Sequence, residues 1–328
     1  MMNENPQELV MGVATQYWTS RCLHVIAELG VADQLGDEPA SAQRLAQQVN
    51  VQPEALFRVL RLLAGFGIFQ ARDGGFAHTP ASRLLRSDHP QSQRAMVRML
   101  GMPIHWAAYG ELEHAVRTGE PAMRKVAGGT FEYLARDPVA SRLFNEAMTG
   151  KSLATIQAVL DAYDFSGFAR IADIGGGNGH LLRGILAAAP RATGVLFDLP
   201  HVIEGVPRSA RIKLQAGSFF KDALPECDAY LLMTVLHDWG DADAIRILQA
   251  VRRAAPAGAR VLVLEMLLPD APGPHPAKSL DIEMLVMTDG GRERTRAEFE
   301  SLFKGAGLKL ARVVPTATAT MIIEGVVG

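Results

Sequence analysis

A short glycine-rich segment is the part of the sequence best suited to bind a ligand. It reads Asp-Ile-Gly-Gly-Gly-Asn-Gly, so that Asp173 precedes glycines at every second place, namely Gly175, Gly177 and Gly179. Glycines permit a tight turn and let a ligand approach the backbone closely. A second acid, Asp198, follows an apolar segment farther along the chain. Because a carboxylate in that place accepts hydrogen bonds from both hydroxyls of a ribose, the pattern predicts a nucleoside site.

Two kinds of nucleoside ligand compete for this segment. A dinucleotide site requires GxGxxG, which places a pyrophosphate on the N-terminus of the following helix. Here the third glycine comes one position early, and Asp173 would repel a pyrophosphate. S-adenosylmethionine has a ribose and an ammonium group but no phosphate, so it fits the two acids better. A glycine-rich turn that binds nothing is the structural alternative.

The segments around this loop alternate between strand and helix patterns from about residue 166 onward. The expected strands are 171–174, 193–197, 212–216, 228–236 and 260–268, and the expected helices are 180–189, 242–255 and 295–306. A hairpin is expected over 309–314 and 319–327, and 269–276 reads as a loop rich in Pro and Gly. This order predicts an α/β fold with a doubly wound, mostly parallel sheet of seven strands, in which ligands bind beyond the carboxyl ends of the strands.

The first half of the chain has a helical pattern. One apolar face of a long first helix is expected to comprise Val10, Ala14, Trp18, Cys22, Val25 and Leu29. Ser41 is a plausible N-cap of a second helix, and Pro53 stands where a third should begin. Two short strands around an Asp-Gly turn follow within residues 68–78. Helices followed by such a hairpin are typical of a winged helix.

A winged helix raises the possibility of nucleic-acid binding. Residues 41–100 contain eight Arg against three acidic residues, and Arg58 and Arg61 lie on one helix. Such a helix could contact DNA phosphates. However, Leu, Val and Phe dominate it, and no cluster of base-reading side chains stands at its start. The pattern therefore favours a packing or dimerisation module whose arginines are solvated.

Composition excludes several other classes of protein. The 328 residues carry 33 Lys and Arg against 35 Asp and Glu, a formal net charge of -2, which argues against a generally cationic nucleic-acid binder. The first residues lack the pattern of a secretory signal, and no apolar run is long enough to span a membrane. The two cysteines, Cys22 and Cys227, are too far apart in sequence for a CxxC or zinc set. We therefore expect a cytoplasmic protein.

Four stretches resemble the small-molecule O-methyltransferases of the caffeate and hydroxyindole type, including their bacterial relatives in natural-product pathways. They are 173–179 (DIGGGNG), 197–202 (FDLPHV), 236–239 (LHDW) and 290–295 (GGRERT), and Phe299 with 304–307 (KGAG) extends the last of them. With the winged-helix front half, the resemblance covers nearly the whole chain. It implies a class I methyltransferase domain of Rossmann type and an N-terminal domain that forms a homodimer and helps close the partner's active site.

The resemblance also implies which residues carry the chemistry. His237 would be the general base, flanked by Glu265 after the fifth strand and by Glu293 in GGRERT, and Asp238 would help place the acceptor hydroxyl. A histidine at a strand end is by itself more often structural. Its position after the fourth strand, with Asp238 beside it and two acids downstream, favours the catalytic interpretation.

For the cofactor, the resemblance implies Gly175 and Asp198, and it places Ser218 and Phe219 at the adenine. Asp173 and Gly177 belong to the same predicted cofactor site. Relatives usually carry Asp where Ser218 stands, and many carry Lys where Met233 stands. Serine can still hydrogen-bond an adenine edge but loses a charge-assisted contact.

The acceptor residues are expected among methionines and one amide. Met148 and Met284 lie in stretches suited to a substrate cavity, because methionine is flexible and makes sulfur–aromatic contacts, although it is also ordinary core filler. Asn145 resembles a family position near the acceptor. No close set of Asp and Asn oxygens is found where a metal-dependent catechol methyltransferase would need one, so we predict no metal.

Together these features predict an S-adenosylmethionine-dependent O-methyltransferase that acts on a phenolic or enolic hydroxyl of a small planar natural product and releases S-adenosylhomocysteine. We expect three parts: a dimerisation domain (1–100), connecting helices that line the substrate cavity (101–165) and a catalytic domain (166–328). Nucleic acid and membrane are not expected partners. Two alternatives remain at this stage: a relative that keeps the cofactor but performs hydroxylation or decarboxylation, and a winged-helix regulator with a nucleoside-sensing domain.

Overall fold

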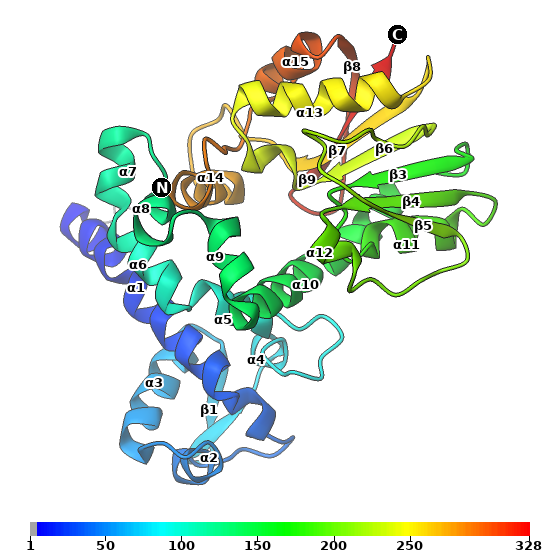
Figure 1. Ribbon diagram of the computed structural model, residues 1–328. Helices are drawn as coiled ribbons and strands as arrows, with labels where there is room; N and C mark the ends of the chain where they lie inside the picture. Colours follow the sequence, from blue (N-terminus) through cyan, green and yellow to red (C-terminus); the bar gives the residue numbers. More distant parts are fainter. Residues whose placement is uncertain (1–4) are drawn as a thin grey trace. The chain divides into compact units, whose positions relative to one another are not determined.

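The computed structural model describes residues 5–328, and these residues divide into two compact units (Figure 1). The first unit contains the chain up to Trp106 together with Pro138–Lys151. The second contains Ala107–Asp137 and Ser152–Gly328. No helix among the described residues has the length and apolar character needed to cross a membrane. The three-part division expected from the sequence stays a prediction.

A seven-stranded sheet forms the centre of the second unit, in the order β5-β4-β3-β6-β7-β9-β8. Its strands are β3 (Arg170–Ile174), β4 (Thr193–Asp198), β5 (Ile212–Ala216), β6 (Ala229–Met233), β7 (Arg260–Met266), β8 (Leu308–Pro315) and β9 (Thr320–Val327). The pairs among β3 to β7 are parallel, and β9 runs antiparallel to both β7 and β8. The predicted fold class is therefore confirmed.

Helices cover both faces of this sheet (Figure 1). One face packs against α13 (Asp241–Ala254) and α15 (Arg296–Gly305), and the other against α11 (His180–Ala188) and the C-terminal part of α10 (Pro138–Ala162). The central strands are buried on both sides and read as continuous apolar runs, as expected of parallel strands. The two apolar layers make the sheet a rigid frame for the loops at its edge.

The carboxyl ends of β3 and β6 mark the place where the strand order reverses. From β3 the sheet continues through β4 to β5 in one direction and through β6 to β7 in the other. Ligands of doubly wound sheets bind at such a switch point, in the crevice between the loops that leave the two strands. The glycine-rich segment follows β3, and the LHDW segment follows β6.

Several further helices of the second unit lie in segments without a strong sequence signal. They are α7 (Leu112–Thr118), α8 (Ala122–Ala127), α9 (Thr130–Arg136), α12 (Pro200–Ile203) and α14 (Pro276–Met287). The sequence predicts only a loop at 269–276 and nothing for α14. This helix has apolar residues on several sides, so no single stripe marks it at helical spacing.

The first unit contains the predicted helices and hairpin. Its elements are α1 (Pro6–Leu29), the 3₁₀ helix η1 (Val31–Gln34), α2 (Ala42–Gln48), α3 (Pro53–Gly65), β1 (Phe69–Arg72), β2 (Gly75–His78), α4 (Pro80–Arg83), α5 (Arg94–Leu100) and the first half of α6 (Pro103–Gly110). Ser41 caps α2 by accepting a hydrogen bond from Arg44 N at 3.2 Å, as predicted. Asp73 and Gly74 have φ of 51° and 74°, the left-handed conformation that an Asp-Gly hairpin turn requires.

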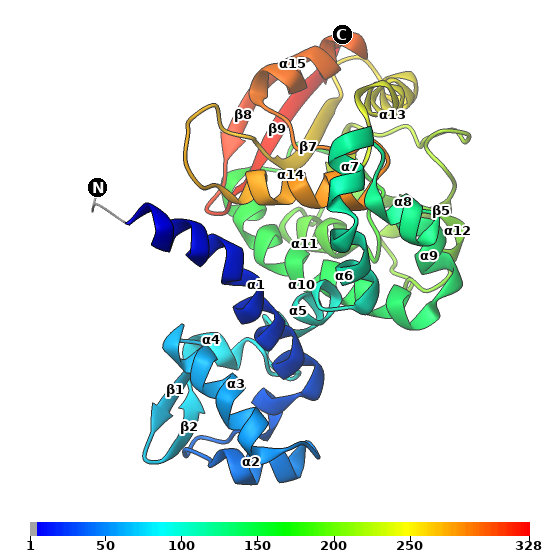
Figure 2. The same cartoon turned by 90° about the vertical axis from the view of Figure 1, so that its left-hand side faces the viewer.

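The apolar face predicted for α1 is only partly buried within the chain. Of its six predicted residues, Cys22, Val25 and Leu29 are partly buried, whereas the buried residues of the helix, Ile26 and Ala27, lie outside the predicted set. Farther up the helix, Val10 and Trp18 are 66% and 56% exposed. The N-terminal half of α1 extends beyond α2 to α4 of its own unit (Figure 2). An exposed apolar surface of this kind marks a site of protein–protein association.

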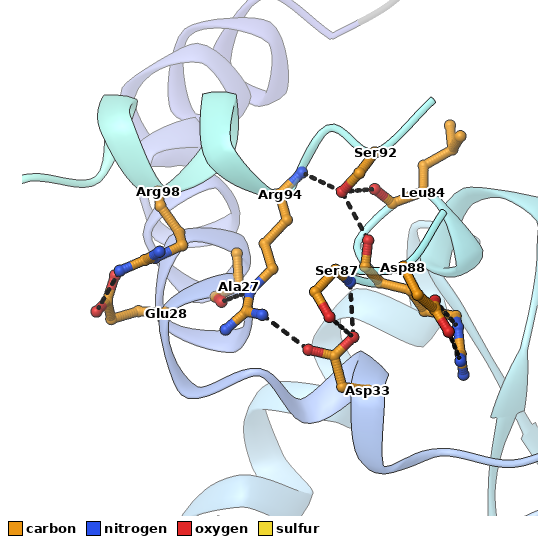
Figure 3. A network of polar contacts seen from close by, with 10 residues as sticks. Ala27, Glu28, Asp33, Leu84, Ser87, Asp88, Ser92, Arg94 and Arg98 are labelled. Carbon is orange, nitrogen blue, oxygen red and sulfur yellow. Dashed lines mark hydrogen bonds and ion pairs between the residues drawn. The ribbon is translucent and has the colours of Figure 1, made fainter. Parts of the chain in front are cut away.

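Five of the eight arginines between residues 41 and 100 make ion pairs, which corrects in part the expectation that they are solvated. Figure 3 shows Arg94 bonded to Asp33 and to the backbone oxygen of Ala27, and Arg98 bonded to Glu28. The N–O distances of the two ion pairs are 2.7 and 2.8 Å. These acids lie upstream of residue 41, so a count over 41–100 missed them. Three further arginines of that window also pair with acids, at positions 72, 83 and 86.

Candidate active site

The glycine-rich segment forms the turn between β3 and α11. Gly175 and Gly177 have φ of 70° and 56°, a left-handed conformation that other residues rarely adopt. The backbone N–H of Gly175 donates to the oxygen of Phe197 at the end of β4, 2.8 Å away. A side chain at Gly175 would also approach Val235 of the next loop to 3.0 Å. The glycines therefore bring three loops of the sheet edge into contact.

Asp198 holds this turn from the end of β4. Its two carboxylate oxygens accept hydrogen bonds from Gly177 N at 2.8 Å and from Leu199 N at 2.7 Å. Burial raises the pKa of Asp198, while these two backbone bonds act in the opposite direction. The bonds fix the orientation of the carboxylate, and a carboxylate acceptor after the second strand suits ribose hydroxyls.

Asp173 is a buried acid at the end of β3. Its residue is 1% exposed, and no hydrogen-bond donor among the described residues reaches its Oδ2 atom. Burial, and then the charge of Asp198, raise the pKa of Asp173 to about 7. Buried polar atoms are almost always bonded, so this oxygen calls for a donor from outside the chain. An ammonium group, or an N–H or O–H of a nucleoside, fits that requirement.

The predicted adenine-contacting residues lie in the loop after β5. Ser218 N donates to Asp222 Oδ2 at 2.8 Å, and the Ser218 Oγ accepts from Phe220 N at 3.3 Å. The Phe219 ring lies edge-on to Trp239, with ring centroids 5.8 Å apart. The loop after β5 therefore packs against the LHDW segment after β6. Met233, the last residue of β6, is partly buried.

His237 lies on a 3₁₀ turn, η2 (Leu236–Asp238), directly after β6. Its residue is 5% exposed, and its Nδ1 atom lies 2.7 Å from Glu293 Oε1. Its Nε2 atom lies 3.6 Å from Asp238 Oδ1. An ionised carboxylate only accepts hydrogen bonds, so Glu293 places a proton on Nδ1 and leaves the Nε2 side for other chemistry.

Glu265, the other predicted flanking acid, contacts the backbone of His237. Its Oε1 accepts from His237 N at 3.1 Å. Burial raises the pKa of Glu265 to about 7, against the opposing charge of His237. Of the two acids, Glu293 bonds the imidazole and Glu265 holds the peptide that carries it.

The charges around His237 favour the protonated imidazole. Burial by itself lowers its pKa, but the charge of Asp238, the hydrogen bond to Glu293 and the charge of Glu265 outweigh burial and raise the pKa to about 9. These acids come from the turn itself, from β7 and from the segment after α14. A cationic imidazole at neutral pH must lose its proton before it can accept another.

Residues 290–294 form a backing strip against the His237 turn. Arg292 N donates to the His237 oxygen at 2.8 Å. A Cβ at Gly291 would lie 2.5 Å from that same oxygen, so only glycine fits there. Asp281 on α14 accepts from Glu293 N at 2.9 Å. The side chain of Arg294 is also fully buried behind the turn.

Sequence reasoning missed Asp281 and Arg294. Arg294 lies within GGRERT, where its position beside Glu293 is the only sequence signal for a role. Asp281 had no comparable signal, because α14 itself was not predicted.

The predicted acceptor residues fall in both units. Met284 is buried on α14 in the second unit. Asn145 and Met148 lie on the part of α10 that belongs to the first unit, where Met148 packs against a small cluster that contains Met99 and Leu143. Their role in acceptor binding stays a prediction. Within the described residues, no group of three or more His, Cys, Asp or Glu side chains is arranged to hold a metal ion.

Comparison with known proteins identifies the family. An O-methyltransferase domain model matches residues 109–309, and an O-methyltransferase dimerisation domain model matches residues 11–88. A phenazine O-methyltransferase of Lysobacter antibioticus is 40% identical over 96% of this chain and 95% of its own length. A mitomycin biosynthesis 6-O-methyltransferase of Streptomyces lavendulae is 36% identical over 94% of this chain and 91% of its own.

A solved structure with the cofactor bound is also similar. Human N-acetylserotonin methyltransferase in complex with S-adenosylmethionine matches with a TM-score of 0.92 and 28% identity over 100% of this chain and 99% of its own. The chain therefore belongs to the S-adenosylmethionine-dependent O-methyltransferase family, in the branch that includes enzymes of natural-product biosynthesis.

Proposed function

We propose that this enzyme methylates a phenolic or enolic hydroxyl of a small planar natural product, with His237 as the general base. The observation that carries the proposal is the 2.7 Å contact between His237 Nδ1 and the buried Glu293. It fixes the imidazole on the same sheet edge as the glycine-rich turn. A positioned base beside a nucleoside site is what methyl transfer to oxygen needs.

The residues of the cofactor site fit S-adenosylmethionine, which supplies an electrophilic methyl group when bound. Asp198 would accept from the ribose hydroxyls, and the orphaned oxygen of Asp173 would accept from a donor of the amino-acid moiety. Gly175 and Gly177 let the ligand approach the backbone. The remaining cofactor residues that we propose are Ser218, Phe219 and Met233.

The mechanism follows from the tautomer that Glu293 imposes. His237 Nε2 accepts the proton of the acceptor hydroxyl while the oxygen forms its bond to the methyl carbon. S-adenosylmethionine would give up its methyl group and leave as S-adenosylhomocysteine, so the products would be a methyl ether, S-adenosylhomocysteine and one proton on His237. Glu293 and Glu265 stabilise the imidazolium. Asp238, 3.6 Å from Nε2, would orient the hydroxyl.

The pH dependence of the rate tests the base directly. Only the neutral imidazole can accept a proton, and the pKa of His237 is about 9 in this structure. With an acceptor that stays neutral over the range, kcat/KM is expected to rise with pH about tenfold per pH unit and to level off near pH 9. Measurement between pH 6 and pH 10 checks this; a flat profile would contradict the assignment.

A direct assay tests the reaction. The purified protein would be incubated with S-adenosylmethionine and a panel of planar phenols and enols, with matched anilines and non-phenolic alcohols as controls. Mass spectrometry would follow the methylated product and S-adenosylhomocysteine together. Methyl ethers from phenols or enols support the proposal, whereas transfer only to anilines or alcohols would overturn the acceptor class.

Self-association is a property of the family, and α1 offers a surface for it. We propose that the exposed apolar residues of α1, which are Leu9, Val10, Met11, Val13, Tyr17 and Trp18, lie in the homodimer interface. The ion pairs of Arg94 with Asp33 and of Arg98 with Glu28 tie these two arginines to acids of their own unit, which favours a packing role for them over contact with nucleic acid. Location in the cytoplasm, and no nucleic-acid or membrane partner, remain part of the proposal.

A charge on this surface is expected to weaken the dimer. Val10→Asp with Val13→Asp would bury two uncompensated carboxylates in the interface. We expect the dissociation constant of the dimer to rise at least tenfold, measured by sedimentation or size exclusion. Val116→Asp is the matched control, because Val116 is 70% exposed on α7 of the other unit. A dimer that the α1 variant leaves intact would place the interface elsewhere.

A further inference from the structure

Arg294 is buried directly behind the turn that carries His237. Its side chain is 0% exposed. Nη1 donates to the Leu236 oxygen at 3.0 Å, and Nη2 donates to the Trp239 oxygen at 2.6 Å. Those carbonyls belong to the residue before His237 and to the residue two places after it. The third donor, Nε, lies 2.9 Å from Asp241 Oδ1 at the start of α13.

We propose that Arg294 is a positioning residue for methyl transfer, which holds both ends of the His237 turn with one planar group. The inference rests on the proposed role of His237 as the base. Glu293 and Arg294 are neighbours in the chain, so one short segment controls both the ring and the backbone of the histidine. Glu293 bonds the imidazole, and Arg294 bonds the peptide groups on either side of it.

The shape of the guanidinium matters more here than its charge. The ion pair with Asp241 is half exposed on the acid side, and such pairs contribute little to the stability of the fold. The two carbonyl bonds, in contrast, need donors that diverge in one plane at a fixed spacing. Lysine has a single ammonium on a flexible stem, so it cannot hold both carbonyls in the same geometry.

The backbone of the turn has other anchors: a local bond from Trp239 N to the Leu236 oxygen at 3.2 Å, and two contacts at its centre. Glu265 accepts from His237 N, and Arg292 N donates to the His237 oxygen. Without Arg294, the Trp239 oxygen would lose its side-chain donor and the Leu236 oxygen would keep only the local bond, so the turn would tilt more easily about that centre. A tilt moves Nε2 relative to the acceptor hydroxyl, and a misplacement of about 1 Å costs roughly a hundredfold in rate.

The test is Arg294→Lys, studied in the full-length enzyme with the acceptor found in the direct assay. We expect kcat to fall about 10- to 100-fold at saturating acceptor and cofactor, with KM and S-adenosylmethionine affinity within about threefold of wild type. The matched control is Arg296→Lys. Arg296 lies two residues after Arg294 and pairs with Glu300 on the surface. A merely structural arginine would lower Tm but leave kcat of the folded enzyme unchanged.

A second readout follows the imidazole itself. NMR titration of His237 reports the charged groups around its imidazole. These are Asp238 on the turn, Glu265 on β7, and Glu293 with the Arg294 cation on the backing strip. We expect the titration midpoint to move in Arg294→Lys and to stay in Arg296→Lys. Wild-type kcat together with an unchanged titration would overturn the proposal.

A variant of the partner keeps the proposal testable if Arg294→Lys does not fold. Asp241→Ala removes the acceptor of the Nε anchor at a half-exposed position, so the fold should persist. We expect kcat to fall about threefold with KM unchanged and the His237 titration to shift in the same direction; no change in either would overturn the proposal. If His237 were not the base, the result would be different: His237→Gln would retain wild-type kcat, while Arg294→Lys would still shift the titration midpoint of His237.

Discussion

His237→Gln is expected to lower kcat about 10²- to 10⁴-fold while S-adenosylmethionine still binds. Glutamine can donate from its amide to Glu293, so the buried carboxylate keeps a partner. It cannot accept the acceptor's proton, so the loss falls on the chemical step. The glycine-rich turn and Asp198 do not depend on this side chain. Steady-state kinetics at saturating cofactor, with calorimetry for cofactor affinity, separates the two effects.

The matched control for this variant is His114→Gln. His114, on α7, also lies near a glutamate, Glu120, with 3.9 Å between Nε2 and Oε2, but a quarter of its side chain is exposed. We expect wild-type kcat for it. A His237→Gln enzyme with more than about a third of wild-type kcat would remove His237 from the role of base.

The second large effect concerns Asp173, where replacement should change stability and binding in opposite directions. We expect Asp173→Asn to unfold at a higher temperature above pH 7 and to bind S-adenosylmethionine about 10- to 100-fold more weakly. The binding loss reflects a charge-assisted hydrogen bond replaced by a neutral one. The stability gain reflects removal of a buried acid that lies beside Asp198.

The sign of the stability effect follows from the pKa of Asp173. Folding raises that pKa from 3.8 to about 7, so the native state binds more protons than the unfolded state between those values. Stability of the wild type therefore falls as pH rises through this window. Asp173→Asn lacks that loss. The difference in free energy of unfolding between the variant and the wild type should therefore grow from pH 4 to pH 7, to roughly 1–4 kcal/mol.

Denaturant unfolding without ligand at pH 5 and pH 8, together with calorimetry, checks both effects. Asp164→Asn serves as the control, because Asp164 is exposed and its pKa is lowered by bonds from Ser166. It should leave cofactor binding unchanged. If Asp173→Asn bound the cofactor as wild type does, the orphaned oxygen of Asp173 would not contact it.

The parts of the fold that the sequence predicts are those with a local physical cause. The turn after β3 requires left-handed φ values, and the glycines at 175 and 177 predict them because glycine adopts such values without strain. The Asp73–Gly74 turn and the Ser41 cap are equally local. The buried parallel strands read as apolar runs because both of their faces are covered.

What the sequence does not predict depends on partners distant along the chain. The pairing of Arg94 and Arg98 needs acids about 60 to 70 residues upstream, so a local charge count could not predict it. The apolar spacing of α1 predicts a buried face but not that part of it is left uncovered by its own chain. Helix α14 has no single apolar stripe that would mark it.

The site shows the same division. The acids near His237 could be named from the sequence and its family resemblance. The sequence could not predict that Glu293 bonds the ring while Glu265 bonds the backbone. That distinction depends on the strip 290–294 passing behind the turn, a contact across more than fifty residues. Arg294 has no visible role until both carbonyls of the turn are located.

The most direct test of general-base catalysis by His237 compares acceptors of different acidity. Single-turnover rates of methyl transfer would be measured for wild type and His237→Gln with a series of phenols of similar shape and decreasing hydroxyl pKa, with S-adenosylmethionine bound beforehand. If His237 removes the proton, the ratio of the two rates should be largest for the least acidic phenol and should approach one as the acceptor ionises by itself. A ratio that stays the same across the series would contradict the account.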